Sequence, residues 1–276
     1  TENELTVKAN KRAFIFSKKD GQLKGVSVDN RKINFANGPR FIGARRADRS
    51  LDQFYNHDDE KAKEKDRTYS EFPDAAVFTK LDVKEDGGNL VVTANYKLGN
   101  LDKAQWTINP SGELALDYTY NFSGVVDLMG IRFDYPEDQV ISKRWLGAGP
   151  YRVWQNRIHG TQYDVWENDY NDPIPGETFT YPEFKGYFGD VSWMNIQTKE
   201  GTISLTNETP DAYIGVYQPR DGRDRLLYTL PESGISVLNV IPPVRNKVNS
   251  TDLCGPSSQP KWVNGPQTGR VIFRFM

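Results

Sequence analysis

The sequence predicts an all-β protein, a large sandwich of stacked antiparallel sheets, and three observations carry this prediction. Apolar and polar residues alternate along much of the chain with the period of two that half-buried strands show. Turn sequences such as KKDGQ, KEDGG, NPSG, PRDGR and PESG separate the alternating segments, and turns of this kind join antiparallel neighbours. Only residues 49–67, which are highly charged and contain no glycine or proline, interrupt the pattern.

Each predicted strand is an alternating run bounded by turn residues. AFIFS (13–17) and QLKGVSVD (22–29) flank the KKDGQ turn near the start of the chain. In ELALDYTYNF (113–122), apolar side chains share one face of the strand, while acidic and amide side chains share the other. The residues expected on the buried face are Leu114, Leu116, Tyr118, Tyr120 and Phe122. The remaining predicted strands are 89–98, 201–208, 212–218, 234–241 and 270–275.

The chain is expected to form a single domain over residues 1–276. No linker-like tract of proline, serine or glycine divides it, and no repeat of fixed period indicates a propeller. About fifteen to twenty strands in one domain lie within the size range of all-β folds. Residues 49–67 are interpreted either as a short surface helix or as a solvated excursion between strands.

Charge and hydropathy exclude several kinds of partner. The chain has 35 Lys and Arg against 37 Asp and Glu, so its net charge of −2 gives no reason to expect nucleic acid or an anionic membrane. No apolar run approaches the ~20 residues of a membrane span. The chain begins TENELTVKANKR, without a methionine or a signal-peptide pattern, so we expect it to be processed or cut from a longer protein.

Few residues are available for metal or nucleophilic chemistry. One cysteine, Cys254, excludes an internal disulfide, and the two histidines, His57 and His159, lack the spacing of a zinc site. No nucleotide-binding glycine motif or nucleophile elbow is present. We therefore expect no cofactor. A calcium or magnesium ion at the acidic clusters 58–60 or 169–172 is the alternative to solvated charge there.

Residues 145–193 are unusually aromatic. Twelve of these 49 residues are aromatic, twice the 12% of the whole chain, and acids and amides lie between them. Trp166 and Tyr170 do not fit the alternation of a strand, which predicts aromatic side chains on loops. Such loops suit a sugar, because a flat ring matches its C–H face and amides or carboxylates match its hydroxyls. Packing against another domain would use the same residues, and both interpretations stay open.

WLGAGPYRVWQNRIHG (145–160) resembles a family signature, W-L-G-x-G-P-x-E-x-Y-x-D-R. The signature belongs to the C-terminal, mutarotase-like "small chain" domain of glycoside hydrolase family 2 β-galactosidases. NKRAFIFSKKDGQLKGVSVDNRKI (10–33) and YPEFKGYFGDVSWMNI (181–196) resemble two further blocks of that domain, so the likeness covers nearly the whole chain. The resemblance implies a supersandwich of the galactose mutarotase-like kind.

The resemblance also implies a function. In the family, a (β/α)₈ barrel carries both catalytic glutamates, so this chain is expected to contain no catalytic residue and to be inactive in hydrolysis alone. It would bind a galactoside-like glycan and shape the active site of that barrel, in an enzyme exported to the periplasm or beyond. The residues expected to bind substrate are Trp154, Asn156, Arg157, His159, Glu183 and Lys185.

The loop departs from the family pattern, which leaves the sugar specificity open. Arg152 replaces a glutamate, Trp154 a tyrosine and Asn156 an aspartate, whereas Arg157 is retained. Two alternative functions therefore accompany the first. One is a stand-alone carbohydrate-binding module in which Trp154, Trp166, Tyr170 and Trp193 stack on sugar. The other is an aldose-1-epimerase, although the sequence around the two histidines does not match that family.

Overall fold

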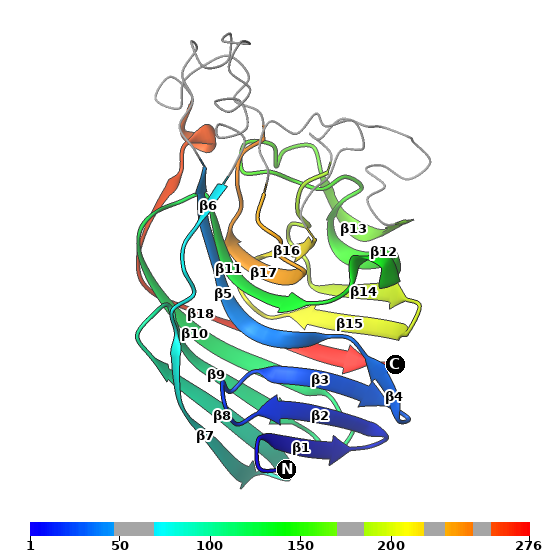
Figure 1. Cartoon of the computed structure of the whole chain (residues 1–276). Helices are drawn as coiled ribbons and strands as arrows, with labels where there is room; N and C mark the ends of the chain where they lie inside the picture. Colours follow the sequence, from blue (N-terminus) through cyan, green and yellow to red (C-terminus); the bar gives the residue numbers. More distant parts are fainter. Residues whose placement is uncertain (47–68, 170–184, 218–229, 245–254) are drawn as a thin grey trace.

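The structure is a computed structural model that describes residues 1–46, 69–169, 185–217, 230–244 and 255–276. Most of the described residues lie in β-strands, which form two nine-stranded sheets in which every strand pair is antiparallel (Figure 1). The described helical segments are two short 3-10 turns, η1 (Glu137–Gln139) and η4 (Pro256–Ser258). The all-β class with stacked antiparallel sheets is confirmed. The segment 49–67 lies outside the described residues.

The first sheet carries the N-terminal hairpins and the strands that position the candidate site. The strands in spatial order are β1 (Glu4–Ala9), β2 (Arg12–Ser17), β3 (Leu23–Val28), β5 (Ala36–Arg46), β11 (Leu128–Asp134), β17 (Ile235–Val240) and β16 (Tyr213–Val216). Two short strands lie off this path, β4 (Arg31–Ile33) on β3 and β6 (Tyr69–Glu71) on β5. The centre of the sheet is therefore β5 paired with β11, which come from distant parts of the chain.

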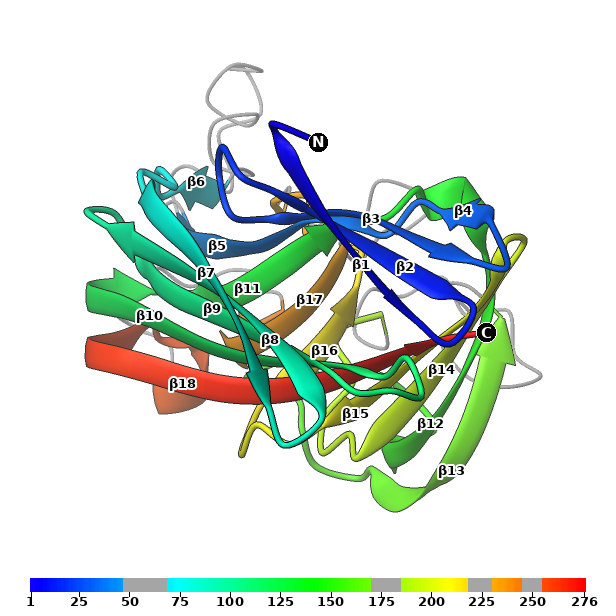
Figure 2. The ribbon, with the colours of Figure 1, turned by 90° about the horizontal axis from the view of Figure 1, so that it is seen from below.

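The second sheet packs against one face of the first, and Figure 2 shows the two layers in one view. Its strands in spatial order are β13 (Gln162–Asp169), β12 (Val140–Gly149), β14 (Trp193–Thr198), β15 (Gly201–Asn207), β18 (Lys261–Phe275), β10 (Leu114–Val126), β9 (Leu101–Ile108), β8 (Asn89–Lys97) and β7 (Val77–Asp86). The two longest strands, β10 and β18, run side by side through its centre.

All eight predicted strands coincide with observed strands. The alternation predicted for 113–122 is confirmed, because all five apolar residues on that face of β10 are at most 9% exposed. Strands such as β5 and β11 gave no alternating signal because both of their faces are largely covered. The start of β18 was missed because it contains Pro266, which the strand tolerates here since this half pairs only with β10.

An aromatic layer fills the space between the two sheets. Phe273 of β18 lies with its ring centroid 5.0 Å from Phe35 and 5.4 Å from Phe133 of the first sheet. Phe41 packs on Tyr120 at 5.5 Å, and these rings are at most 1% exposed. Ring pairs of this kind contribute beyond the area they bury. This layer holds the sheets together and leaves the opposite face of the first sheet for a second cluster.

A smaller hydrophobic cluster covers that opposite face of β5, β11 and β17. The strands contribute Ile42, Ala44, Leu128 and Leu238, and the connecting segments contribute Val153, Trp154, Tyr187, Leu230, Ile241 and Val244. The segment after β12 therefore lies directly on the first sheet. In the part of the chain described, no helix is long and apolar enough to cross a membrane.

Candidate functional site

The signature segment 145–160 forms a corner at the end of β12. Trp145, on β12, is fully buried, and its ring packs edge-on against Phe188 with the centroids 4.9 Å apart. Its indole N–H donates a hydrogen bond to the carbonyl oxygen of Ala148, 3.0 Å away. The first residue of the signature is therefore an anchor that fixes where the chain leaves the strand.

The small residues of the corner are required by close approach of neighbouring chain. A Cβ atom on Gly147 would lie 2.9 Å from the carbonyl oxygen of Gly189. One on Gly149 would lie 2.3 Å from the indole ring of Trp166, and the Gly149–Pro150 peptide bond is cis. The W-L-G-x-G-P part of the signature thus corresponds to packing at a sharp turn of the chain.

Trp154 is the first of the predicted substrate-binding residues, and its side chain lies inside the second cluster. It is 2% exposed, and its ring packs edge-on against Tyr187 at 5.7 Å. Backbone hydrogen bonds join Trp154 and Arg157 in both directions, at 3.2 and 2.9 Å, and close a tight turn. In this conformation the indole presents no face to a sugar, and its burial explains why an aromatic residue stands here.

The amide of Asn156 ties three distant segments together. Its Nδ2 donates to the carbonyl oxygen of Val244 at 2.8 Å and to the Ser258 hydroxyl at 3.3 Å. Its Oδ1 accepts from the Val244 backbone N–H at 2.8 Å. Neighbouring Gln155 likewise donates to the carbonyl oxygen of Gln259 at 2.7 Å. The side chain predicted to bind sugar therefore has partners within the fold.

The other predicted substrate-binding residues are placed differently. Arg157, which closes the turn, and His159, just beyond it, have exposed side chains. The His159 carbonyl oxygen accepts a hydrogen bond from Tyr151 at 3.0 Å. Lys185 is 8% exposed and begins the segment that pairs with Val153. Glu183 lies outside the described residues. The structure brings Trp154, Asn156 and Arg157 into one turn, and a role of the set in substrate binding stays a prediction.

The expectation that Trp166 lies on a loop is wrong, because it lies on β13. Trp145 and Trp193 of the same aromatic segment lie on the neighbouring strands β12 and β14. Trp166 broke the alternation because β13 is the edge strand of its sheet, with most of its side chains exposed, so no strict in-out pattern is imposed. Tyr170 lies outside the described residues.

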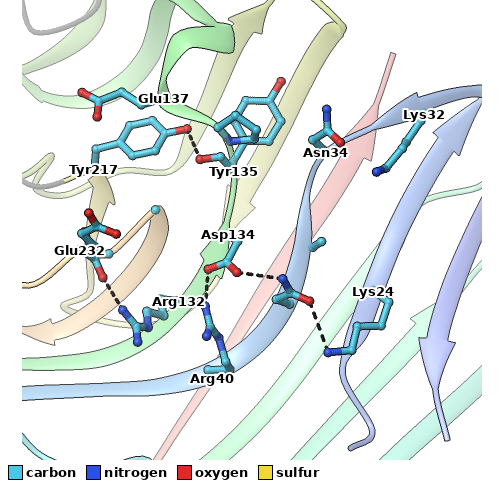
Figure 3. A pocket seen from close by; sticks show the side chains of 15 residues that line it. Lys24, Lys32, Asn34, Arg40, Arg132, Asp134, Tyr135, Glu137, Tyr217 and Glu232 are labelled. Atoms are coloured by element: carbon cyan, nitrogen blue, oxygen red, sulfur yellow. Dashed lines mark hydrogen bonds and ion pairs between the residues drawn. The ribbon is translucent and has the colours of Figure 1, made fainter. Parts of the chain in front are cut away.

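A polar pocket of about 800 Å³ opens on the same outer face of the first sheet, further along β5 and β11 (Figure 3). The lining residues come from β3 and β4, the start of β5, the end of β11, the turn η1 and the segments just after β16 and just before β17. Four of the lining side chains are cationic and three are acidic: Lys24, Lys32, Arg40, Arg132, Asp134, Glu137 and Glu232. Its size is that of a small-molecule site.

Arg40 and Arg132 lie directly opposite each other in the β5–β11 register and form the floor of the pocket. Arg40 makes an ion pair with Asp134, whose other oxygen accepts a hydrogen bond from Asn37 at 2.9 Å. Asn37 in turn accepts from Lys24 at 3.3 Å, so a continuous polar chain crosses the pocket (Figure 3). The amide of Asn37 orients both neighbours, because it donates to the acid and accepts from the base.

Arg132 is held from the other side. It donates to the backbone carbonyl of Glu232, and its Nη2 lies 4.0 Å from the Glu71 carboxylate. The Nε atoms of both Arg132 and Arg40 are buried and have no hydrogen-bond partner among the described residues. The Oγ of Ser233, a pocket residue that is 2% exposed, is likewise buried and without a partner in this part of the chain. Such buried orphan donors are rare in folded proteins and mark places where a ligand or water completes the bonding.

Two tyrosines form a rigid wall of the pocket. The hydroxyl of Tyr217 donates to the carbonyl oxygen of Tyr135 at 2.6 Å, and the hydroxyl of Tyr135 donates to Glu200 at 2.9 Å. Burial raises the pKa of Tyr135 above its usual range, and the Glu200 carboxylate raises it further. The phenol therefore stays protonated and acts as a fixed hydrogen-bond donor, not as a base.

Comparison with known protein families identifies the family of this chain. The family model described as "Beta galactosidase small chain" matches residues 8–249, which include the signature corner and the charged pocket residues. The chain belongs to the beta-galactosidase small chain family. This small-chain protein is therefore a carbohydrate-related domain, and the comparison with curated proteins finds no match.

Solved structures similar to this small-chain protein have low sequence identity to it. Galactose 1-epimerase from Lactobacillus acidophilus has a TM-score of 0.49 at 9% identity, and 99% of this chain covers 94% of that one. A GalM/aldose epimerase homologue from C. elegans has a TM-score of 0.45 at 7% identity, and the match covers 99% of this chain and 98% of that one. The alpha-N-acetylgalactosaminidase NagBb from Bifidobacterium bifidum has a TM-score of 0.46 at 11% identity. The match covers 99% of this chain but only 36% of the length of NagBb.

The pocket of the small-chain protein was missed at the sequence level. Its residues come from segments as distant as Lys24 and Glu232, and the short run that contains opposed charges of the pocket is IRFDYPE, with Arg132, Asp134 and Glu137. The signal that existed was a charged residue inside each of two apolar runs, Arg40 in GPRFIGA and Arg132 in LMGIRFD. As for metals, the described residues hold no cluster of three or more His, Cys, Asp or Glu side chains. The acidic cluster 58–60 lies outside them.

Proposed function

We propose that this chain is the small-chain part of a family 2 glycoside hydrolase, in which it binds carbohydrate and shapes the active site of a (β/α)₈ catalytic barrel. The observation that carries the proposal is the family match over residues 8–249 together with the signature at 145–160. The buried anchors of the corner support it, because they hold the turn at 154–157 in one position. A positioning domain needs such rigidity, since small displacements near a reacting bond cost rate.

The isolated 276-residue chain is expected to show no glycosidase activity. Hydrolysis of a glycosidic bond requires two carboxyl groups in a fixed geometry, and in this proposal the barrel supplies both. Release of nitrophenol from an aryl β-galactoside should equal the buffer rate, while far-UV circular dichroism confirms that the chain is folded. Turnover that a single Glu→Gln change within the chain abolishes would overturn the proposal. The mass of the native polypeptide is the companion measurement, and the proposal requires one much longer than this chain.

A stand-alone sugar-binding module is the second candidate, and Trp262 favours it. This tryptophan on β18 is 71% exposed, although it was not among the predicted stacking residues. It lies opposite Val125, and the next pair on the same face is Ser123 with Asn264, whose side chains are hydrogen-bonded at 2.9 Å. An exposed indole beside amide and hydroxyl groups suits the apolar face and hydroxyl rim of a pyranose.

If Trp262 is such a platform, Trp262→Ala should weaken galactoside binding about tenfold, the loss of one aromatic contact of ~1.4 kcal/mol. The fold should be unaffected, because the side chain is exposed. Intrinsic fluorescence titrations measure the effect, and Leu98→Ala, at another exposed apolar position, is the matched control. A titration that is flat for the unmodified chain across neutral sugars would remove this candidate.

A further inference from the structure

We propose that the pocket over Arg40 and Arg132 binds a saccharide that carries an anionic group, either a carboxylate or a sulfate ester. The site is distinct from the signature corner and has a charge pattern of its own. That the ligand is a sugar rests on the proposed function, whereas that it carries an anion rests only on the pocket's side chains.

The opposed side chains of Arg40 and Arg132 are the first feature of the pocket that favours an anionic ligand. Side chains directly opposite on an antiparallel pair lie close, and like charges there are unfavourable unless anions compensate them. Asp134 and Glu71 compensate in part, and the charges of both arginines also act on the carboxyl of Asp74, where they oppose the rise in its pKa that desolvation causes. Each guanidinium nevertheless retains unused N–H donors, including the buried Nε. Paired guanidinium forks are the preferred protein partners of carboxylate and sulfate-like oxyanions.

The distribution of the remaining charged side chains around the pocket is the second feature that favours such a ligand. Figure 3 shows Lys24 and Lys32 on one side of the pocket and Glu137 and Glu232 on the other, with Arg40 between. Lys24 already pairs with Asp20 at 2.8 Å, but the ammonium of Lys32 has no partner among the described residues. The basic side therefore has a free cation beside the arginine floor. The acidic side offers acceptors for hydroxyl groups, so the two ends of a ligand would be told apart.

Local chain geometry keeps this pocket open and preorganised. Gly234 has a positive φ of 53°, and a Cβ atom there would lie 2.0 Å from the carbonyl oxygen of Phe133. The segment 232–234 is thereby held against the end of β11, with Glu232 and the orphan hydroxyl of Ser233 at the pocket wall. The lining of the pocket has one more cationic than acidic side chain, in a protein whose net charge is −2. An anion is thus drawn to a local feature and not to the protein as a whole.

The test is direct binding to the 276-residue chain by isothermal titration calorimetry at low ionic strength. Galacturonate, galactose 6-sulfate and neutral galactose are compared, with acetate and inorganic sulfate as anions without a sugar. We expect at least one acidic sugar to bind tenfold or more tightly than both galactose and the simple anions. Whichever of galacturonate and galactose 6-sulfate binds tighter identifies the anionic group. Added salt should weaken this binding, because the recognised charges are partly exposed.

Variants then assign the binding to the pocket. Lys32→Glu should lower the affinity for the acidic sugar at least tenfold without affecting the fold, because the lysine is exposed. Arg40→Gln should lower it similarly, and Arg40→Lys should have an intermediate effect because charge is kept while the planar fork is lost. Lys80→Glu changes a lysine that is 64% exposed on β7, and it is the control for net charge.

Three results would overturn the inference. Equal affinity for galactose and the acidic sugars removes the anion, and undiminished binding by Lys32→Glu and Arg40→Gln removes the pocket. Binding of acetate or sulfate as tight as that of the acidic sugars removes the sugar. None of these bears on the proposed function, whose own test is the absence of hydrolysis by the isolated chain. Failure of one proposal is therefore distinguishable from failure of the other.

Discussion

Replacing Trp145 with alanine is expected to lower the free energy of unfolding by about 4 kcal/mol, near the upper range for a buried aromatic residue. The indole is fully buried, packs edge-on against Phe188 at 4.9 Å and donates to the Ala148 carbonyl oxygen. Its removal leaves a cavity at the junction of β12 and the corner. Urea unfolding followed by circular dichroism measures the loss, and the midpoint of thermal unfolding should fall by roughly 10 °C.

Conservative changes at two buried tryptophans separate packing from hydrogen bonding. Trp145→Phe keeps most of the ring but leaves the Ala148 carbonyl oxygen without its donor, which costs about 1–3 kcal/mol if that oxygen stays dry. Trp106 is equally buried, but no described residue accepts a hydrogen bond from its indole nitrogen. Trp106→Phe removes an unsatisfied donor and should cost less than Trp145→Phe. The opposite order, or a loss below 1 kcal/mol for Trp145→Ala, would show that Trp145 does not anchor the corner.

The signature was readable in the sequence, but the roles of its residues were not. Tryptophan and asparagine in an aromatic segment suit sugar binding and suit packing equally well. What decides between them at Asn156 is Val244, which lies 88 residues further along the chain and exchanges two hydrogen bonds with its amide. The sequence contains the amide but not its distant partner. The family could therefore be predicted from the residues of the motif, whereas the hydrogen-bond partners of the turn residues could not.

The pocket illustrates a second kind of limit. Alternation of apolar and polar residues reveals strands that have one solvent-exposed face, so the predicted strands include the outer hairpins and β10. The strands β5 and β11 were not predicted, because both of their faces are covered. These two strands place Arg40 and Arg132 opposite each other, although 92 residues separate them in the chain. A register between undetected strands cannot be predicted from local patterns. Sites built on central strands are therefore the ones that sequence analysis misses here.

The corner and the pocket share one face of the first sheet, which links them physically. Along β5, Arg40 faces the pocket, while Ile42 and Ala44 on the same side of the strand pack under Trp154 and Tyr187. On β11, Arg132 and Leu128 stand in the same relation, with Gly130 between them. A change that lifts the corner off the sheet would expose the apolar floor next to the arginines. Stability of the corner and ligand binding in the pocket should therefore vary together in variants of the corner.

Gly186→Ala is expected to be the most damaging glycine substitution in the corner, with a loss of about 3 kcal/mol. A Cβ atom at residue 186 would lie 2.0 Å from the Val153 carbonyl oxygen and 3.0 Å from the Trp154 indole nitrogen. The first of these is backbone, which a rotamer change cannot move aside. The two hydrogen bonds between Val153 and Tyr187, at 2.7 and 2.8 Å, would have to open. The cover of the second cluster would then separate from the first sheet.

The control for Gly186→Ala is Gly255→Ala. A Cβ atom on Gly255 meets nothing within 4 Å, and the residue has an ordinary φ of −63°, so this substitution should leave stability unchanged. Urea midpoints compare the two variants, and near-ultraviolet circular dichroism reports on the packing of Trp154 against Tyr187. A midpoint for Gly186→Ala equal to that of the control would mean that the Val153–Tyr187 pairing bears no strain. The corner would then not be what holds the turn at 154–157 on the sheet.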